Sequence, residues 1–471
     1  MGDAYLHFRS NYSLLRGCRS PEEICHFARE HDISSVGMAD INNFYGLISF
    51  LLAAGREGVR PVVGVAVEQA GRSLFTACVM NREGYSRICR VLTDMLTDQA
   101  GTYDPVAALQ DRGWEGLSLL SPHPDVIQRL ADRERQGLYV QLRYGRPFSA
   151  LAGFARDRGL PTAATQDTVL LREADERLYP VLRAIDLNTT LERVPAEDIL
   201  GAEHAFVELS ALERFFSAVP DALLNTRAIA READASGIIS PRFIFPAFNG
   251  MAEEDTFRLL RRLCEAGVQR RYGGIRLDIR ERLDYELSII QEKGFASYFL
   301  VVQDIVQQCP RTCGRGSAAS SIVSYLLGIT HVDPLRYNLF FERFLNRGRK
   351  DPPDIDVDFP WDEREKTLKF VFEKYAGHAA MVANHVTFGP RSAIRDPAKA
   401  LGLPEDEISE IVRAFRQGRF DDIPPYVRET AARIRGFPRN RRARWAAPPP
   451  GGASRRSSGR QLAAGCSCCC W

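Results

Sequence analysis

The sequence predicts a mixed α/β fold, with a largely parallel sheet or barrel over about the first 240 residues and a helix-rich region after them. Val36–Ala39 and Pro61–Val65 have the length and apolar character of buried strands, and Leu47–Gly58 between them has helical periodicity. Alternating strands and helices typically build a parallel sheet covered by helices. Ser20 followed by Pro21 predicts the start of a further helix, with serine as its N-cap.

The composition is that of a globular protein without membrane spans. The chain has 471 residues, 45% of them hydrophobic and 26% charged, and no apolar run approaches the ~18 residues of a membrane helix. The N-terminus resembles neither a basic leader nor a signal peptide, so we expect a cytoplasmic protein. The formal net charge of +2 does not indicate nucleic-acid binding, which must come from local patches.

Residues 436–471 differ from the rest of the chain. They contain seven arginines and no acidic residue, and they are rich in Pro, Gly, Ala, Ser and Cys. Such a segment cannot bury enough apolar surface to offset the entropy of ordering, so we expect it to be disordered. Two interpretations stay open: a frameshifted end of the reading frame, or a basic tail that binds nucleic acid.

Three aspartates alternate with apolar residues in Asp354–Phe359. In a strand, Asp354, Asp356 and Asp358 would share one face. Neighbouring carboxylates repel one another unless a cation lies among them, and Mg²⁺ prefers such oxygen ligands. A pair of these ions can clamp the attacking and leaving oxygens of a phosphoryl transfer. The alternative is a solvated edge strand with outward-facing polar residues.

A turn of small residues, Gly314–Ser321, precedes the apolar stretch Ile322–Leu327. Small residues let the backbone approach a ligand closely, and a helix starting at Ile322 would direct N–H groups toward a phosphate. The turn is not a Walker A loop, because no Gly-Lys-Ser/Thr follows. The alternative is a tight turn with a serine cap.

Taken in order, these motifs resemble the palm of C-family DNA polymerases, the family of bacterial DNA polymerase III α subunits. The resemblance covers residues 314–320, 327–335, 341–346 and 353–359, with further matches at 294–300 upstream and at 387–396 and 399–402 in the start of the thumb. The residues around 352–353 and 360–364 are more similar to the error-prone paralogue than to the main replicase.

The resemblance implies roles for individual residues. The metal-binding catalytic aspartates fall on Asp354 and Asp356, and Asp358, a neighbouring third acid, is the third expected metal ligand. The residues implied to contact the incoming triphosphate are Gly316, Ser317 and Arg343. The implied reaction is Mg²⁺-dependent attack of a primer 3′-hydroxyl on a deoxynucleoside triphosphate. The implied partners are primer–template DNA, a sliding clamp and other replisome or mutasome proteins, with no membrane.

Residues 6–17 resemble the first motif of the polymerase and histidinol phosphatase (PHP) domain, but several expected metal ligands are replaced. Only His7, Asp40 and Asp167 match ligand positions. Arg9 stands where the family has a histidine and Arg16 where it has an acid. The other replacements are at Ile41, Ala66 and Val169. The resemblance therefore predicts a structural PHP domain without phosphoesterase or proofreading activity, in which His7 is buried and hydrogen-bonded.

The expected architecture is a PHP-type (β/α) barrel-like domain at 1–240, an incomplete α+β palm at 241–388, the start of a helical thumb at 389–435 and the tail at 436–471. No acid after Asp358 lies in a recognisable motif for the family's further palm aspartate. We therefore expect a truncated chain that is inactive or very weak alone. Two other functions stay open: a metal-dependent phosphoesterase of the PHP type, and a non-catalytic fragment.

Overall fold

The computed structural model describes residues 3–239, 247–309, 311–349, 351–382 and 384–438. The chain forms two compact units. The first takes in the described residues of 1–239 and 385–445, and the second those of 240–384. Most of the predicted disordered tail, from residue 439 on, lies outside the described residues. Each unit is considered by itself.

Seven strands of the first unit form one sheet in chain order: β1 (Asp3–Phe8), β2 (Ile33–Ile41), β3 (Arg60–Gln69), β4 (Arg72–Val79), β5 (Leu117–Ser121), β6 (Leu138–Arg143) and β7 (Thr162–Thr165). All neighbours are parallel except β4, which runs antiparallel to both β3 and β5. A parallel bridge joins Phe8 to Thr168, just after β7, so the sheet nearly closes into a barrel. The predicted parallel sheet or barrel is confirmed, although the sequence did not indicate the reversed strand.

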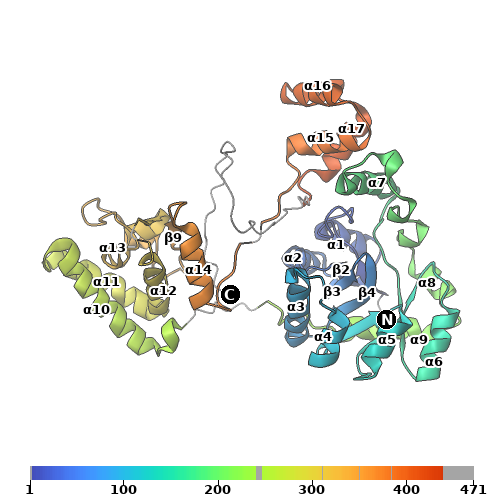
Figure 1. The fold of residues 1–471 in the computed structure, drawn as a ribbon, viewed down its shortest axis with the longest axis horizontal. Helices are drawn as coiled ribbons and strands as arrows, with labels where there is room; N and C mark the ends of the chain where they lie inside the picture. The colour runs from blue at the N-terminus through green and yellow to red at the C-terminus, as the bar shows by residue number, and fades with distance from the viewer. Residues whose placement is uncertain (1–2, 240–246, 310, 350, 383, 439–471) are drawn as a thin grey trace. The chain divides into compact units, whose positions relative to one another are not determined.

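Helices surround this sheet (Figure 1). They are α1 (Pro21–Glu30), α2 (Leu47–Glu57), α3 (Arg82–Thr97), α4 (Pro105–Arg112), α5 (Pro124–Ala131), α6 (Ser149–Arg158), α7 (Glu173–Leu187), α8 (Leu209–Phe215) and α9 (Pro220–Glu232), with short 3₁₀ turns at Leu191–Arg193, Ala196–Asp198 and Ala202–His204. The predicted start of α1 is confirmed, since Ser20 accepts the N–H of Glu23 in a capping box. The α2 helix ends at Gly58, whose left-handed conformation favours glycine.

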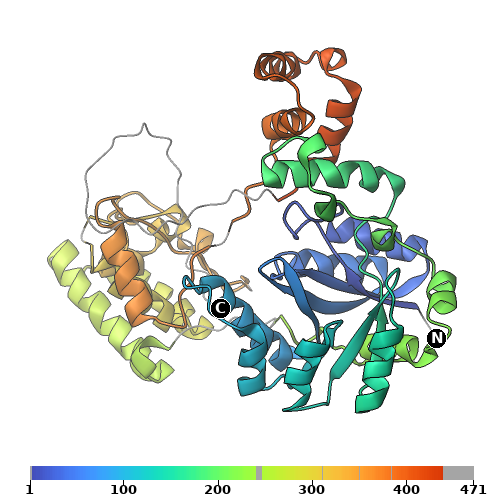
Figure 2. The ribbon, with the colours of Figure 1, turned by 45° about the vertical axis from the view of Figure 1, so that its right-hand side comes forward.

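Three later helices form a bundle in the same unit, and α15 of this bundle packs directly against α7 (Figures 1 and 2). They are α15 (Pro390–Ala400), α16 (Glu405–Arg416) and α17 (Pro425–Ile434), with a 3₁₀ turn at Phe420–Asp422. Leu182 of α7 shares one apolar core with Ile394 and Val427. The fully buried carboxylate of Asp175 accepts hydrogen bonds from Arg19 and Arg433. The segment expected to start a thumb is thus anchored to the barrel domain.

The second unit is mainly helical. Its elements are a 3₁₀ turn at Phe248–Gly250, α10 (Glu253–Tyr272), α11 (Leu277–Lys293), α12 (Ala296–Val306), β8 (Cys313–Arg315), η5 (Gly316–Ser320), α13 (Ile322–Leu327), η6 (Phe341–Arg343), β9 (Asp356–Asp358) and α14 (Arg364–Lys374). Strands β8 and β9 form an antiparallel pair, and Phe299, Phe341 and Phe344 lie fully buried in the core. Across the described part of the chain, no helix combines the length and apolar character needed to cross a membrane.

Candidate functional site

The aspartate strand lies at the surface of the second unit with its apolar side chains turned inward. Ile355 is buried, and Val357 and Phe359 pack against the same core. Asp354 is exposed and Asp356 is half-buried. The alternation expected from the sequence is therefore confirmed: the apolar side chains form the inner face and the carboxylates point away from the core.

The glycine-serine turn lies directly beside this strand. Arg315 pairs with Asp356 in the β8–β9 register, and Gly316 follows with a φ of +67°. A Cβ added to Gly316 would stand 3.4 Å from Oδ2 of Asp356, so the absence of a side chain leaves the carboxylate and the turn open to a shared ligand. Ser317 is exposed in the same turn.

Arg343 lies close to this turn, because η5 and η6 are in contact. Its side chain is exposed and makes no hydrogen bond or ion pair with any residue that the structure describes. An unpaired guanidinium can bind phosphate oxygens through two parallel hydrogen bonds. The structure therefore brings the predicted metal-binding and triphosphate-binding residues into one neighbourhood.

The start of α13 does not offer free N–H groups, as the phosphate-cradle interpretation required. The fully buried carboxylate of Glu286 occupies it: Ile322 N–H donates at 3.0 Å, Val323 N–H at 3.3 Å and the Ser321 hydroxyl at 2.7 Å. Ser321 also caps the helix by accepting the N–H of Ser324. That part of the prediction is wrong, and the serine-cap alternative is correct.

Glu286 belongs to a network that fixes the turn. Arg282 donates through Nε to Glu286 at 2.7 Å, and through Nη2 to the carbonyls of Ser320 and Leu339 at 2.9 Å each. Burial raises the pKa of Glu286, against the lowering effect of these donors. Sequence reasoning missed both residues, because an Arg–Glu pair four positions apart usually marks a solvated helix face.

The upstream motif at 294–300 contributes one contact to the aspartate strand. The backbone N–H of Ile355 donates to the hydroxyl of Tyr298 at 3.1 Å. This bond fixes the backbone of Ile355, the residue between Asp354 and Asp356, to α12. The tyrosine was part of the family resemblance, but its spacing alone gave no hint of this role.

The three aspartates differ in their counter-charges. Asp358 forms an ion pair with Arg315, at 3.1 Å between Oδ1 and Nε, whereas Asp354 and Asp356 have no basic partner within the described ranges. No three His, Cys, Asp or Glu side chains in those ranges are grouped closely enough to hold a metal ion. Two uncompensated carboxylates still suit Mg²⁺, which commonly takes its other ligands from water and substrate phosphates.

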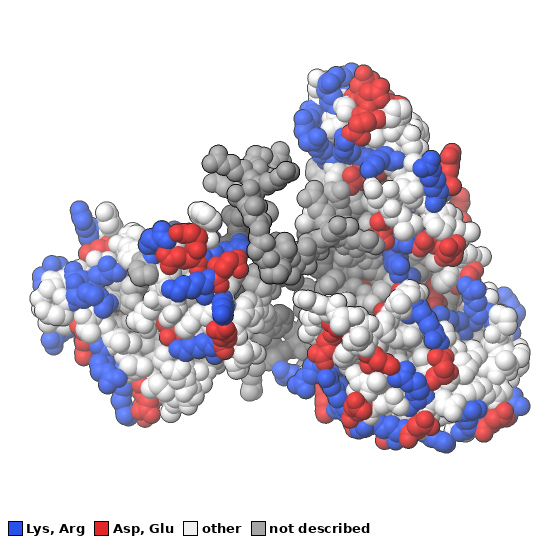
Figure 3. All heavy atoms as spheres, viewed as in Figure 1, with Lys and Arg blue, Asp and Glu red and all other residues white. Residues whose placement is uncertain are grey.

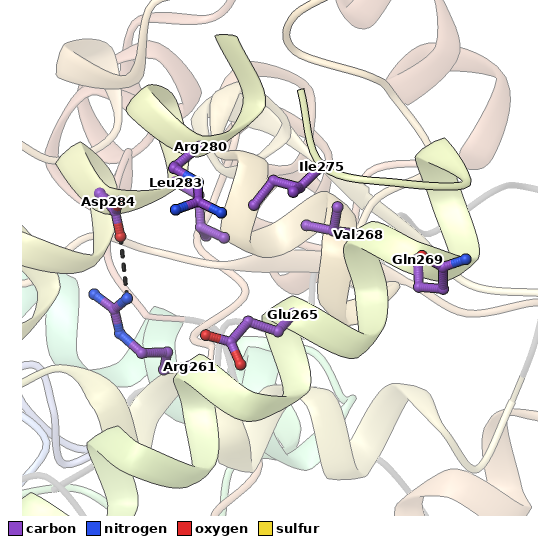
Figure 4. Close-up of a pocket in the computed structure, with 8 residues that line it drawn as sticks. All are labelled: Arg261, Glu265, Val268, Gln269, Ile275, Arg280, Leu283 and Asp284. Atoms are coloured by element: carbon purple, nitrogen blue, oxygen red, sulfur yellow. Dashed lines mark hydrogen bonds and ion pairs between the residues drawn. The ribbon is translucent and has the colours of Figure 1, made fainter. Parts of the chain in front are cut away.

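A surface pocket in the same unit lies between α10 and α11 and contains none of the predicted site residues (Figure 4). The Arg261–Asp284 ion pair, at 3.1 Å, joins the two helices there. We assign this pocket no part in the candidate site.

The barrel domain holds the other residues at predicted metal-ligand positions, which are His7 on β1, Asp40 on β2 and Asp167 after β7. His7 is only 2% exposed, and its Nδ1 lies 3.0 Å from Oδ1 of Asp167 and 3.4 Å from the hydroxyl of Thr76. The expected buried, hydrogen-bonded histidine is confirmed. Burial lowers the pKa of His7 to about 4, and nearby Arg9 and Arg143 act in the same direction.

Arginines supply the positive charge in this group. Arg143 lies 3.5 Å from Asp167, and with His7 and Arg9 it holds the pKa of that carboxyl well below its ordinary value, although burial acts the other way. Arg16, at the position of a lost acid, pairs with Glu68 at 2.9 Å. Guanidinium groups repel the metal ions that the family's ligands would bind, so these residues do not fit a multi-metal cluster.

Asp40 is also satisfied within the protein. It accepts the Ser10 N–H at 2.8 Å and the hydroxyls of Ser10 and Ser13 at 2.6 Å each. Burial raises the pKa of Asp40. The contribution of Arg143 was not anticipated, but its place at the end of β6 could have indicated it, since the ends of parallel strands meet at one edge of a sheet.

Comparisons with known proteins match two parts of the chain to two different domain families. Residues 5–137 match the PHP domain, and residues 258–440 match the bacterial DNA polymerase III alpha NTPase domain. An error-prone DNA polymerase of Mesorhizobium japonicum is 33% identical over 92% of this chain and 42% of its own length. The DNA polymerase III subunit alpha of Borreliella burgdorferi is 29% identical over 88% of this chain and 40% of its own length.

A further relative, the error-prone DNA polymerase of Mycobacterium tuberculosis, is 32% identical over 93% of this chain and 44% of its own length. The chain thus spans less than half the length of these relatives. The first match lies within the barrel, and the second runs through the helical unit and on through α15 to α17, which belong to the first unit. The chain therefore carries a PHP domain followed by the NTPase domain of bacterial DNA polymerase III alpha, and over most of its length it is similar to error-prone DNA polymerases and DNA polymerase III alpha subunits.

Proposed function

We propose that the second unit holds the nucleotidyl-transfer site of a DNA-directed DNA polymerase, in which a primer 3′-hydroxyl attacks the α-phosphate of a deoxynucleoside triphosphate and releases pyrophosphate. The observation that carries the proposal is the uncompensated pair Asp354 and Asp356, placed beside an open glycine turn and the unpaired Arg343. Negative and positive charges left without partners at one place suit a metal ion and a polyphosphate bound together.

Each residue has a defined part in this proposal. Asp354 and Asp356 would hold Mg²⁺, which would neutralise charge at the reacting phosphate. The η5 backbone at Gly316 and Ser317 approaches the phosphates, and Arg343 pairs with a phosphate oxygen. Asp358 keeps Arg315 in place. Positioning and fixed charges do most of the catalysis.

The proposed setting follows from the relatives. Primer–template DNA and nucleotides are the substrates, the reaction takes place in the cytoplasm, and a sliding clamp with other replisome or mutasome proteins are the partners. The similarity around residues 360–364 favours error-prone translesion synthesis over bulk replication. A PHP phosphoesterase is the weaker alternative, because Arg9 and Arg143 oppose its metals.

Manganese binding tests the metal site directly. We expect the free-Mn²⁺ paramagnetic resonance signal to fall when the chain is titrated in the presence of a deoxynucleoside triphosphate. Asp354→Asn and Asp356→Asn should each weaken binding by about tenfold or more, since each removes a charged ligand. Asp278→Asn is the matched control, since Asp278 lies in the first turn of α11 and its carboxylate pairs with Arg276. This variant should bind Mn²⁺ like wild type. Equal binding by all variants would refute the site.

Primer extension tests the activity of the chain itself. We expect little or no incorporation by the 471-residue protein. Robust incorporation that disappears in Asp356→Ala would support the polymerase site and overturn the expectation that this chain is inactive alone. Incorporation that persists in Asp356→Ala would place the active site elsewhere.

A further inference from the structure

The turn before η6 presents two exposed aromatic rings. Tyr337 is 58% exposed and Phe340 62%, whereas the adjacent Phe341 is fully buried in the core. The turn is fixed by backbone hydrogen bonds, among them Leu339 N–H to the carbonyl of Pro334 at 2.8 Å. The two rings are therefore held at the surface by an ordered backbone.

The acidic residues next to these rings are engaged elsewhere. Asp333 accepts the hydroxyl of Tyr272 on α10 at 2.8 Å, and Glu342 accepts the hydroxyl of Tyr285 on α11 at 2.8 Å. Both carboxylates are thus tied to the helices of the unit. Asp333 also accepts the backbone N–H of Arg336, but neither carboxylate forms an ion pair with the guanidinium of Arg336 or Arg343 in the described part of the chain.

Those arginines remain exposed without an ion pair in the described part of the chain. They are Arg336, whose guanidinium lies 5.6 Å from the Tyr337 ring centroid, and Arg343. Elsewhere basic and acidic side chains are mixed over the face seen in Figure 3, and many are paired. The segment therefore combines unneutralised positive charge with exposed rings.

We propose that Tyr337 and Phe340 stack on the bases of a single-stranded nucleic acid, with Arg336 contacting its backbone. Stacking rings interleaved with unpaired cations are the combination that binds single strands without regard to sequence. The segment continues into η6, which touches the glycine turn. The assignment of that strand as the unpaired template rests on the proposed polymerase function.

Fluorescence anisotropy with a labelled oligothymidine tests this surface, using the full chain in EDTA. We expect Tyr337→Ala and Phe340→Ala each to weaken binding by about fivefold or more, since one stacked base contributes at least that much. An abasic sugar-phosphate oligomer of the same length has no bases to stack. Wild type should therefore bind it as weakly as the two variants bind the thymidine oligomer, or more weakly. Tyr426→Ala, at a ring 48% exposed in the other unit, is the control and should be unchanged.

Conservative variants separate stacking from simple apolar docking. Tyr337→Phe should retain affinity and Tyr337→Leu should lose it; full affinity in Tyr337→Leu would overturn the proposal and indicate a protein-docking surface.

Arg336→Gln should lower the slope of log K against log salt by about 0.7. Equal binding by wild type and all variants, or no binding by wild type, would also refute it. The double variant Asp354→Asn/Asp356→Asn should bind the strand normally in EDTA, so failure of the metal site and failure of this surface are distinguishable.

Discussion

The two units each carry carboxylates at positions where metal ligands are predicted, and the two groups have opposite surroundings. In the barrel, Asp167 is buried against His7 and Arg143, and Asp40 is covered by serine donors. In the second unit, Asp354 and Asp356 face outward without a basic partner among the described residues. One group is neutralised by its own protein, and the other still requires a cation.

This difference separates carboxylates that the protein itself compensates from carboxylates that are left open to a cation. A buried carboxylate needs a counter-charge, and a guanidinium can provide it permanently. The arginines therefore make Asp167 part of the structural core. If charge compensation separates the two groups, removing a carboxylate should destabilise the barrel and leave the second unit as stable as before.

The largest expected effect is on stability in the barrel. Asp167→Asn leaves Arg9 and Arg143 without their counter-charge, and we expect the free energy of unfolding to fall by roughly 3 kcal/mol. Asp354→Asn should cause no measurable loss, because that side chain is exposed and unpaired. Urea denaturation of both variants measures the contrast. Equal losses in the two variants would contradict it.

The pH dependence of stability should also originate in the barrel. The pKa of His7 is about 4 in the folded chain, below the value of about 6.5 in the unfolded chain, so the unfolded state takes up a proton first. The free energy of unfolding should therefore decrease by about 3 kcal/mol as pH falls from about 6.5 to 4. The depressed pKa of Asp167 adds its own loss only at lower pH, below its unfolded value of about 3.9.

A histidine variant checks this assignment. Urea titrations at pH 7 and pH 4.5 should show a much smaller difference for His7→Gln than for wild type. His26→Gln, at a half-exposed position on α1, should keep the wild-type difference. A pH response that survives in His7→Gln would assign the effect to another group.

A smaller loss of stability is expected where a buried carboxylate pairs with two arginine side chains. Asp175 pairs with both Arg19 and Arg433, so Arg433→Gln should cost about 1–2 kcal/mol and leave the carboxylate compensated. Limited proteolysis should then cut more rapidly around α15 to α17, with the barrel intact. Unchanged protection would show that the shared apolar core alone holds these helices.

The smallest effect is expected at Asp358, the acid that already has a partner. Loss of its exposed pair with Arg315 should change stability by no more than about 0.5 kcal/mol. Mn²⁺ affinity should stay within about twofold in Asp358→Asn if this carboxylate lies outside the metal site. A tenfold loss would place it among the ligands and remove the distinction drawn between the three aspartates.

The sequence predicts the parts of this molecule that depend on local pattern. The barrel strands and the cap of α1 follow from periodicity and from Ser20. The outward face of Asp354 and Asp356 follows from alternation. The reversal of β4 leaves no comparable signal, because an apolar strand has the same pattern in either direction.

Contacts between distant segments were not predictable in the same way. Glu286 appears as an ordinary charged helix residue, yet it is fully buried against the start of α13. Arg143 enters the barrel site only because β6 ends beside β7. The packing of α15 to α17 on α7 depends on a core assembled from segments more than 200 residues apart. Long-range pairing, rather than local propensity, decides each of these features.

That shared core has a consequence for biosynthesis. The apolar face of α7 around Leu182 is covered by helices that end at Ile434, and the 145 residues of 240–384 come between. At translation speeds of about 5–20 residues per second, the ribosome needs about 10 to 50 s to complete the covering helices after α7 has been made. The apolar face of α7 therefore stays exposed while the whole second unit is synthesised. We expect a chaperone to be needed most during this interval.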